Sequence, residues 1–89
     1  MNAETYINHP TFGLLFRLCL LGENRELFTT LYAQRLFFVV SASDRGLVFE
    51  PLGRADARLM LENRLRQLRR ERKDKEFQRL QAIHRQTFQ

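Results

Sequence analysis

The most regular feature of the chain is an alternation of apolar residues near its N-terminus. Every second residue from 12 to 20 is apolar, namely Phe12, Leu14, Phe16, Leu18 and Leu20, whereas Gly13, Arg17 and Cys19 interrupt the positions between them. Since successive side chains of a strand point to opposite faces, this pattern predicts a half-buried β-strand. We therefore expect its five apolar side chains to face the core.

Three further strands are expected between residues 22 and 50. Gly22-Glu23-Asn24 has turn chemistry, and residues 26–31 and 35–41 are rich in aromatic and β-branched side chains. Asp44-Arg45-Gly46 is typical of a second hairpin turn, and residues 47–50 follow it. Four short antiparallel strands with little else between them predict a small, strongly bent sheet or a barrel the size of an SH3 or Tudor domain.

After Gly53 the chain changes to a helical pattern. Residues 54–89 contain no glycine or proline and almost no β-branched residue. Gly53 suits a helix N-cap, and Asp56 places a carboxylate in the first turn, where the helix dipole favours negative charge. A first apolar stripe with helical spacing consists of Ala57, Leu61, Leu65 and Leu68, and a later set consists of Phe77, Leu80, Ile83 and Phe88.

One straight helix cannot carry both apolar sets on the same face. Phe77 follows Leu68 by nine residues, so at about 100° per residue the two lie on opposite sides of a continuous helix. We therefore expect two helices with a hinge near residues 69–74, and Asp74 as the second N-cap. Because the hinge lacks glycine and proline, an extended form costs little, and we expect both closed and open arrangements.

Charge divides the chain near Pro51-Leu52-Gly53. Residues 1–53 carry four Arg and five Asp or Glu, a net charge of −1, whereas residues 54–89 carry eleven Lys or Arg and five Asp or Glu, a net charge of +6. We expect an α+β chain with a β domain of residues 1–53 and a basic helical hairpin of residues 54–89.

The sequence offers little catalytic or metal-binding chemistry. His9, His84 and Cys19, its two histidines and one cysteine, have no metal-ligand spacing. His9 is expected in a loop because Pro10 follows it, and no phosphate-binding glycine loop occurs. These absences predict a protein that is not an enzyme and needs no cofactor.

The sequence also predicts where in the cell the protein is located. No apolar run approaches the roughly 20 residues of a membrane span, and the N-terminal residues lack a secretory pattern. Cys19 is the single cysteine, and its apolar neighbours suggest a buried thiol. We therefore expect a cytoplasmic protein with no membrane contact.

The basic stretch RLRQLRRERKDK, residues 64–75, is compatible with three interpretations. It can be a solvated amphipathic helix with acid–base pairs four residues apart. It can be a nucleic-acid contact in which Arg66, Arg69 and Arg70 neutralise phosphates, which makes a small RNA- or DNA-binding protein the alternative function. It can also dock on an acidic protein surface.

Several segments together resemble one family. NHPTFGLLF (8–16), ELFTTLYAQRLFFVV (26–40), RGLVFEPLGR (45–54), NRLRQLRR (63–70) and the ending QTF (86–88) are similar to the PipX family, small cyanobacterial proteins named for their interaction with the PII signalling protein. The resemblance implies a Tudor-like, five-stranded bent sheet followed by two helices, and a non-enzymatic adaptor that is a monomer when free.

The resemblance also implies two alternative partners. At low 2-oxoglutarate the T-loops of PII hold such a protein. At high 2-oxoglutarate and ATP, PII releases it, and it becomes a coactivator of the transcription regulator NtcA. From the net charge of +6, and not from the resemblance, we expect the basic helices then to be free for contact with RNA polymerase or nearby DNA.

The same resemblance implies a partner-binding face around the LYAQR motif. Its tyrosine is Tyr32, which the residues alone would also allow to pack over its own barrel end. The implied face consists of Tyr32, Gln34, Arg35, Leu36 and Phe38, together with Glu4, Tyr6, Phe12 and Leu14. For Phe12 and Leu14 this expectation conflicts with the alternation described above, which directs them to the core.

Overall fold

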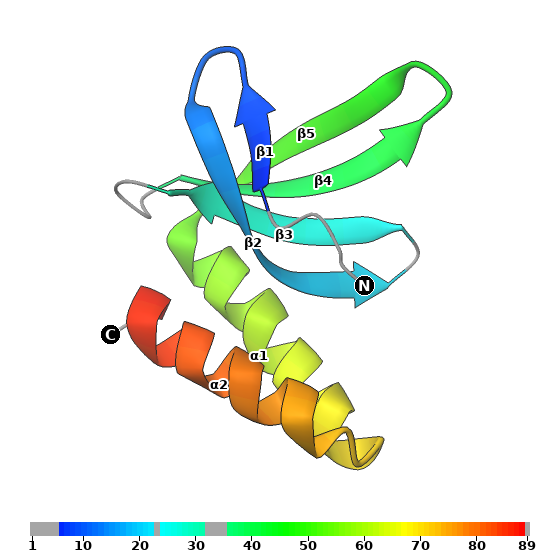
Figure 1. The fold of residues 1–89 in the computed structure, drawn as a ribbon, viewed down its shortest axis with the longest axis vertical. Helices are drawn as coiled ribbons and strands as arrows, with labels where there is room; N and C mark the ends of the chain where they lie inside the picture. The colour runs from blue at the N-terminus through cyan, green and yellow to red at the C-terminus, as the bar shows by residue number, and fades with distance from the viewer. Residues whose placement is uncertain (1–5, 23, 32–35, 89) are drawn as a thin grey trace.

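The computed structural model describes residues 6–22, 24–31 and 36–88. Its elements are β1 (Tyr6–His9), β2 (Gly13–Gly22), β3 (Arg25–Thr30), β4 (Phe37–Ser43), β5 (Gly46–Leu52), α1 (Arg54–Arg70) and α2 (Asp74–Phe88). The five strands pair in chain order, each antiparallel to the next. They form a curled half-barrel, and the two helices lie side by side against it (Figure 1). The expected α+β fold is therefore confirmed.

The structure has one strand more than the residue pattern predicts. The additional strand is β1, a four-residue strand whose Tyr6 pairs with Phe16 and whose His9 pairs with Gly13. A strand this short, followed at once by Pro10, leaves almost no alternation to detect. The five strands that the family resemblance implies are present.

The prediction for the buried face of β2 is correct for Leu18, which is buried, and wrong for Phe12 and Leu20. Leu15 and Cys19 are buried, whereas Phe12 and Leu20 expose 42% and 47% of their surface. One reason is a register shift between Arg17 and Cys19, which interrupts the alternation within the strand. The other reason is that both faces of the curled sheet are covered, so β2 needs apolar side chains on both of its sides.

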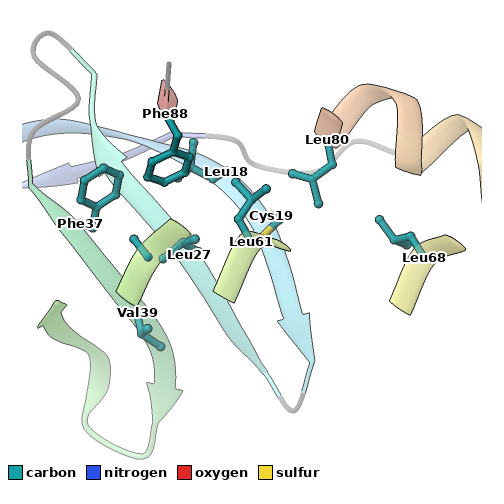
Figure 2. Packing of buried hydrophobic residues seen from close by; sticks show 10 residues of the cluster. Leu18, Cys19, Leu27, Phe37, Val39, Leu61, Leu68, Leu80 and Phe88 are labelled. Atoms are coloured by element: carbon teal, nitrogen blue, oxygen red, sulfur yellow. The ribbon is translucent and has the colours of Figure 1, made fainter. Parts of the chain in front are cut away.

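Two clusters of buried side chains lie on the two faces of the sheet. The inner cluster receives side chains from all five strands and consists of Leu15, Phe28, Phe38 and Val40, with Ile7 and Phe49 packed against it. The outer cluster joins the sheet to the helices and consists of Leu18, Cys19, Leu27, Phe37, Val39, Ala57, Leu61, Leu68, Leu80 and Phe88 (Figure 2). The helices are therefore the cover of the outer face.

The predicted start of α1 and the predicted break between the helices are confirmed. Gly53 is the N-cap of α1 and Asp56 lies in its first turn. The helix ends at Arg70, and the Lys73 N–H donates to the carbonyl of Leu68 across the turn. Arg72 occupies the left-handed position of this turn with φ 58°, a place where glycine is usual.

One detail of the second helix start differs from the prediction. The Phe77 N–H donates to the carbonyl of Lys73 over 2.9 Å, so Lys73 is the cap residue. Asp74 is instead the first residue of α2, where its carboxylate still faces the positive end of the helix dipole. The prediction that Asp74 is the N-cap is therefore wrong by one position.

Candidate functional site

One end of the half-barrel carries a hollow of about 280 Å³ that is lined by rings. We call it the aromatic hollow, and it is formed by His9, Phe12, Leu36, Phe37, Phe38, Phe49, Pro51 and Leu52. These residues come from β1, the turn after it, the residue before β4, and the strands β4 and β5. The curl of the sheet brings them together, because β1 and β5 are its two outermost strands in pairing order.

The rings of the aromatic hollow pack on one another. The centroids of Phe12 and Phe38 lie 5.3 Å apart, those of His9 and Phe12 5.0 Å apart, and those of His9 and Phe49 4.8 Å apart. Offset and edge-on ring pairs at such distances are mutually stabilising. The hollow is therefore a supported surface rather than a set of independent side chains.

His9 fixes the turn that carries Phe12. Its Nδ1 accepts hydrogen bonds from the backbone N–H groups of Thr11 over 3.0 Å and of Phe12 over 3.2 Å. An Nδ1 that accepts carries no proton, so these bonds require the imidazole form protonated on Nε2 alone. His9 was expected in a loop and is instead the last residue of β1. The sequence analysis did not predict that His9 holds this turn, and the neighbouring Pro10 gives no indication of it.

The structure divides the predicted partner-binding residues between two faces. Phe12 and Leu36 expose 42% and 44% of their surface at the aromatic hollow, and Phe38 is almost fully buried there. Tyr6 is 47% exposed but pairs with Phe16, on the face opposite to the inner cluster. The half-buried Leu14 pairs with Asn8 on that same opposite face. Tyr6 and Leu14 therefore do not line the hollow.

Four predicted residues, Tyr32, Gln34, Arg35 and Glu4, lie outside the described residues. The residues that bracket 32–35 are well anchored. The Leu31 N–H donates to the carbonyl of Leu14 over 3.0 Å, and the carbonyl of Leu36 accepts from the Thr30 N–H over 3.1 Å and from the Thr29 hydroxyl over 2.8 Å. Leu31 and Leu36 are thus held to the sheet, and Leu36 belongs to the aromatic hollow.

The predicted basic residues form a separate surface on α1. Arg66 is exposed and hydrogen bonds to the Asn63 side chain. Arg69 is also exposed, and its guanidinium lies 5.5 Å from the centroid of the Phe77 ring. Arg70 is exposed in the last turn of the helix. None of the three lines the aromatic hollow.

Among the residues that the structure describes, the two titratable groups with clearly shifted pKa values, Cys19 and Glu62, do not act together as an acid–base pair. Burial raises the pKa of the Cys19 thiol from 9.0 to about 12, against the opposing charges of Arg64 and Arg17. Hydrogen bonds from His84 and Arg58 lower the pKa of Glu62, which joins α1 to α2. In the described parts of the chain, no group of three or more His, Cys, Asp or Glu is placed to hold a metal ion.

Within residues 6–22, 24–31 and 36–88, no helix combines the length needed to cross a membrane with an apolar composition.

Comparison with known proteins places the chain in a family. No curated protein matches the chain significantly. The family model described as PipX, PII-interacting protein X, matches residues 3–88 of the 89 residues. This match covers both the sheet with its aromatic hollow and the two helices, which agrees with the five strands and two helices implied by the resemblance. The chain therefore belongs to the PipX family of PII-interacting proteins.

Proposed function

We propose that this protein is a non-enzymatic cytoplasmic adaptor that exchanges between two partners according to the level of 2-oxoglutarate. At low 2-oxoglutarate, the T-loops of PII hold it. At high 2-oxoglutarate and ATP, PII releases it, and it binds NtcA as a coactivator of transcription. The family match supports the interaction with PII, whereas exchange with NtcA is part of the proposal.

The observation that carries the proposal is the pair of exposed apolar residues at the aromatic hollow. Phe12 and Leu36 offer large apolar side chains to solvent on a floor that includes the buried Phe38. Large residues on a packed floor are typical of the few positions that dominate binding between proteins. Leu36 directly follows the segment with Tyr32, Gln34 and Arg35, the motif residues that the family resemblance assigns to partners.

The use of one surface for two partners has an energetic consequence. If both PII and NtcA cover the aromatic hollow and Tyr32, occupation by one excludes the other. The distribution then follows the two concentrations and affinities, so a metabolite that changes the affinity of PII also changes the supply of free adaptor. The adaptor needs no binding site for 2-oxoglutarate in this scheme.

The basic face of α1 is free for a third contact when the hollow is occupied. The helical part has a net charge of +6, and Arg66 and Arg70 are exposed. Contact with RNA polymerase or DNA through Arg66, Arg69 and Arg70 is the corresponding part of the proposal. Nucleic-acid binding without PII or NtcA is the alternative function.

The test is partner exchange with purified proteins. The full chain is immobilised and exposed to PII with ADP, and then to PII with ATP and 2-oxoglutarate. We expect retention in the first condition and release in the second, followed by capture of 2-oxoglutarate-loaded NtcA. In a competition experiment, NtcA must displace PII rather than join it.

Two outcomes would contradict the proposal. A stable complex that contains PII and NtcA on the same adaptor molecule would show that the binding surfaces are separate. Recovery from a cyanobacterial extract that depends on nuclease-sensitive material, and not on 2-oxoglutarate, would support the nucleic-acid alternative. Leu59→Ala serves as the matched control for variants of the aromatic hollow such as Phe12→Ala, since Leu59 is an exposed apolar residue on α1.

A further inference from the structure

A second cavity lies between the sheet and the helix pair, away from the aromatic hollow. It has a volume of about 410 Å³, within the usual size of small-molecule pockets. We call it the sheet–helix pocket, and it is lined by Phe16, Arg17, Leu18, Cys19, Leu20, Arg64, Leu68, Glu76, Arg79, Leu80 and Ile83. No lining residue is shared with the aromatic hollow.

The floor of the sheet–helix pocket is apolar. Leu18 from β2, Leu68 from α1 and Leu80 from α2 are all buried and belong to the outer cluster (Figure 2). Cys19 adds a thiol whose pKa burial raises to about 12, so it stays protonated and uncharged at neutral pH. Leu20 at the rim leaves 47% of its surface in water. Above this floor, Leu20 and the half-buried Phe16 and Ile83 offer the apolar surface that a ligand placed here would cover.

The charged lining is predominantly positive. The lining includes three arginines, Arg17, Arg64 and Arg79, and one acidic residue, Glu76. Arg17 is already paired with Glu26 over 3.0 Å. Arg64 donates to the neutral amide of Gln67, and among the described residues neither Arg64 nor Arg79 has an ion-pair partner. Two cations at the edge of an apolar floor are complementary to one anionic group with an apolar tail.

We propose that the sheet–helix pocket binds a free anionic amphiphile, a small monocarboxylate with an unbranched apolar chain. The apolar chain lies on Phe16, Leu20 and Ile83, the accessible apolar residues of the lining, and the carboxylate lies beside Arg64 and Arg79. A neutral apolar molecule would leave the guanidinium groups without a partner. A multiply charged metabolite would place charge on the apolar floor, which is costly.

Such a ligand would hold the helices to the sheet. It contacts β2, α1 and α2 together, and a ligand that binds only the folded arrangement stabilises it in proportion to its occupancy. This inference does not depend on the interaction with PII or NtcA, because the two cavities have separate linings.

The test uses decanoate, below its micelle concentration, with the full chain labelled with ¹⁵N. We expect saturable shifts of the backbone amides of Cys19, Leu80 and Ile83, little change at Phe12 and Leu36, and a rise in melting temperature. Arg64→Gln and Arg79→Gln should each raise the dissociation constant for decanoate by about tenfold, the usual cost of losing one charge-assisted hydrogen bond.

The controls separate this site from general affinity for anions. Arg66→Gln and Arg70→Gln remove exposed charges of α1 that do not line the pocket, and they should leave decanoate binding unchanged. Decanol and decyltrimethylammonium should bind at least about tenfold more weakly, since they lack the negative charge.

Four results would overturn the proposal. They are shifts confined to the aromatic hollow, equal weakening by the control variants, no saturation at millimolar decanoate, and binding to phosphatidylglycerol vesicles without binding of free decanoate. The last result would assign the charged rim to a membrane lipid instead.

Discussion

The ring of Phe88, at the end of α2, stacks on the ring of Phe37, at the start of β4, with centroids 5.5 Å apart and planes inclined by 17° (Figure 2). The next residue of β4, Phe38, belongs to the inner cluster and contributes to the aromatic hollow. Neighbouring side chains of one strand thus support the helix cover on one face and the candidate partner surface on the other.

This relationship predicts a large effect of Phe88→Ala. The substitution removes a buried ring that also lies 5.1 Å from the guanidinium of Arg54. We expect the free energy of unfolding in urea to fall by about 3 kcal/mol. Gln86→Ala, at an exposed position of the same turn, should change it little. Equal effects of the two variants would show that the last turn of α2 does not secure the helix.

Glu62 links stability to pH. His84 Nε2 donates to Glu62 Oε2 over 2.9 Å, and this bond, with that from Arg58, lowers the pKa of Glu62 below its ordinary 4.5. A lowered folded-state pKa stabilises the fold above pH 4.5, and this stabilisation is lost as the pH falls through the lowered value.

The corresponding variant is Glu62→Gln. We expect it to lower the free energy of unfolding by about 1 kcal/mol at pH 6 and to match the parent protein progressively more closely below pH 4.5. Glu50→Gln, at an exposed position of β5, serves as the control. Urea unfolding between pH 3 and pH 7 measures both, and a pH-independent difference would contradict this origin of the stabilisation.

We expect the replacement of Arg72 by glycine to stabilise the fold. It adopts φ 58° in the turn between the helices, where a side chain is unfavourable and glycine is not. Arg72→Gly should raise the free energy of unfolding by about 0.5 kcal/mol. Arg70→Gly, two residues earlier and inside α1, should lower it by about 1 kcal/mol. Destabilisation by both variants would mean that the Arg72 side chain makes a contribution larger than the backbone cost.

The shared-surface proposal makes a prediction for Tyr32 and Phe12. We expect Tyr32→Ala and Phe12→Ala each to weaken binding of both PII and NtcA by about 2 kcal/mol. Because Phe12→Ala also removes ring contacts with His9 and Phe38, circular dichroism must first show that this variant is folded at the temperature of the titration. Calorimetric titrations with each partner provide the measurement. Loss of one complex with the other unchanged would show that the two partners use different surfaces.

The basic face of α1 is tested by charge reversal. The triple substitution Arg66→Glu, Arg69→Glu and Arg70→Glu should reduce NtcA-dependent transcription and abolish any salt-sensitive binding to DNA, while PII binding persists, because these residues lie outside the aromatic hollow. Unchanged transcription would remove RNA polymerase and DNA from the proposal.

Local patterns along the sequence were sufficient for the helices but not for the faces of the sheet. The break between Leu68 and Phe77 follows from helical rotation alone, and the structure confirms it. The exposed position of Leu20 does not follow, because it lies beyond a register shift in β2 and because both faces of the sheet are covered. The aromatic hollow joins His9 to Phe49, and only the curl of the whole sheet places these rings together.

β3 shows what the helix cover means for the rest of the molecule. Three consecutive residues, Leu27, Phe28 and Thr29, are buried, so no side of the strand centre touches water. A fragment that ended at Gly53 would expose the apolar outer face of this strand and of its neighbours. The same fragment would have two unpaired edge strands, and exposed apolar surface beside such edges promotes self-association. If α2 leaves the sheet, another surface must therefore cover the outer face. We do not expect the sheet to be stable as an independent domain.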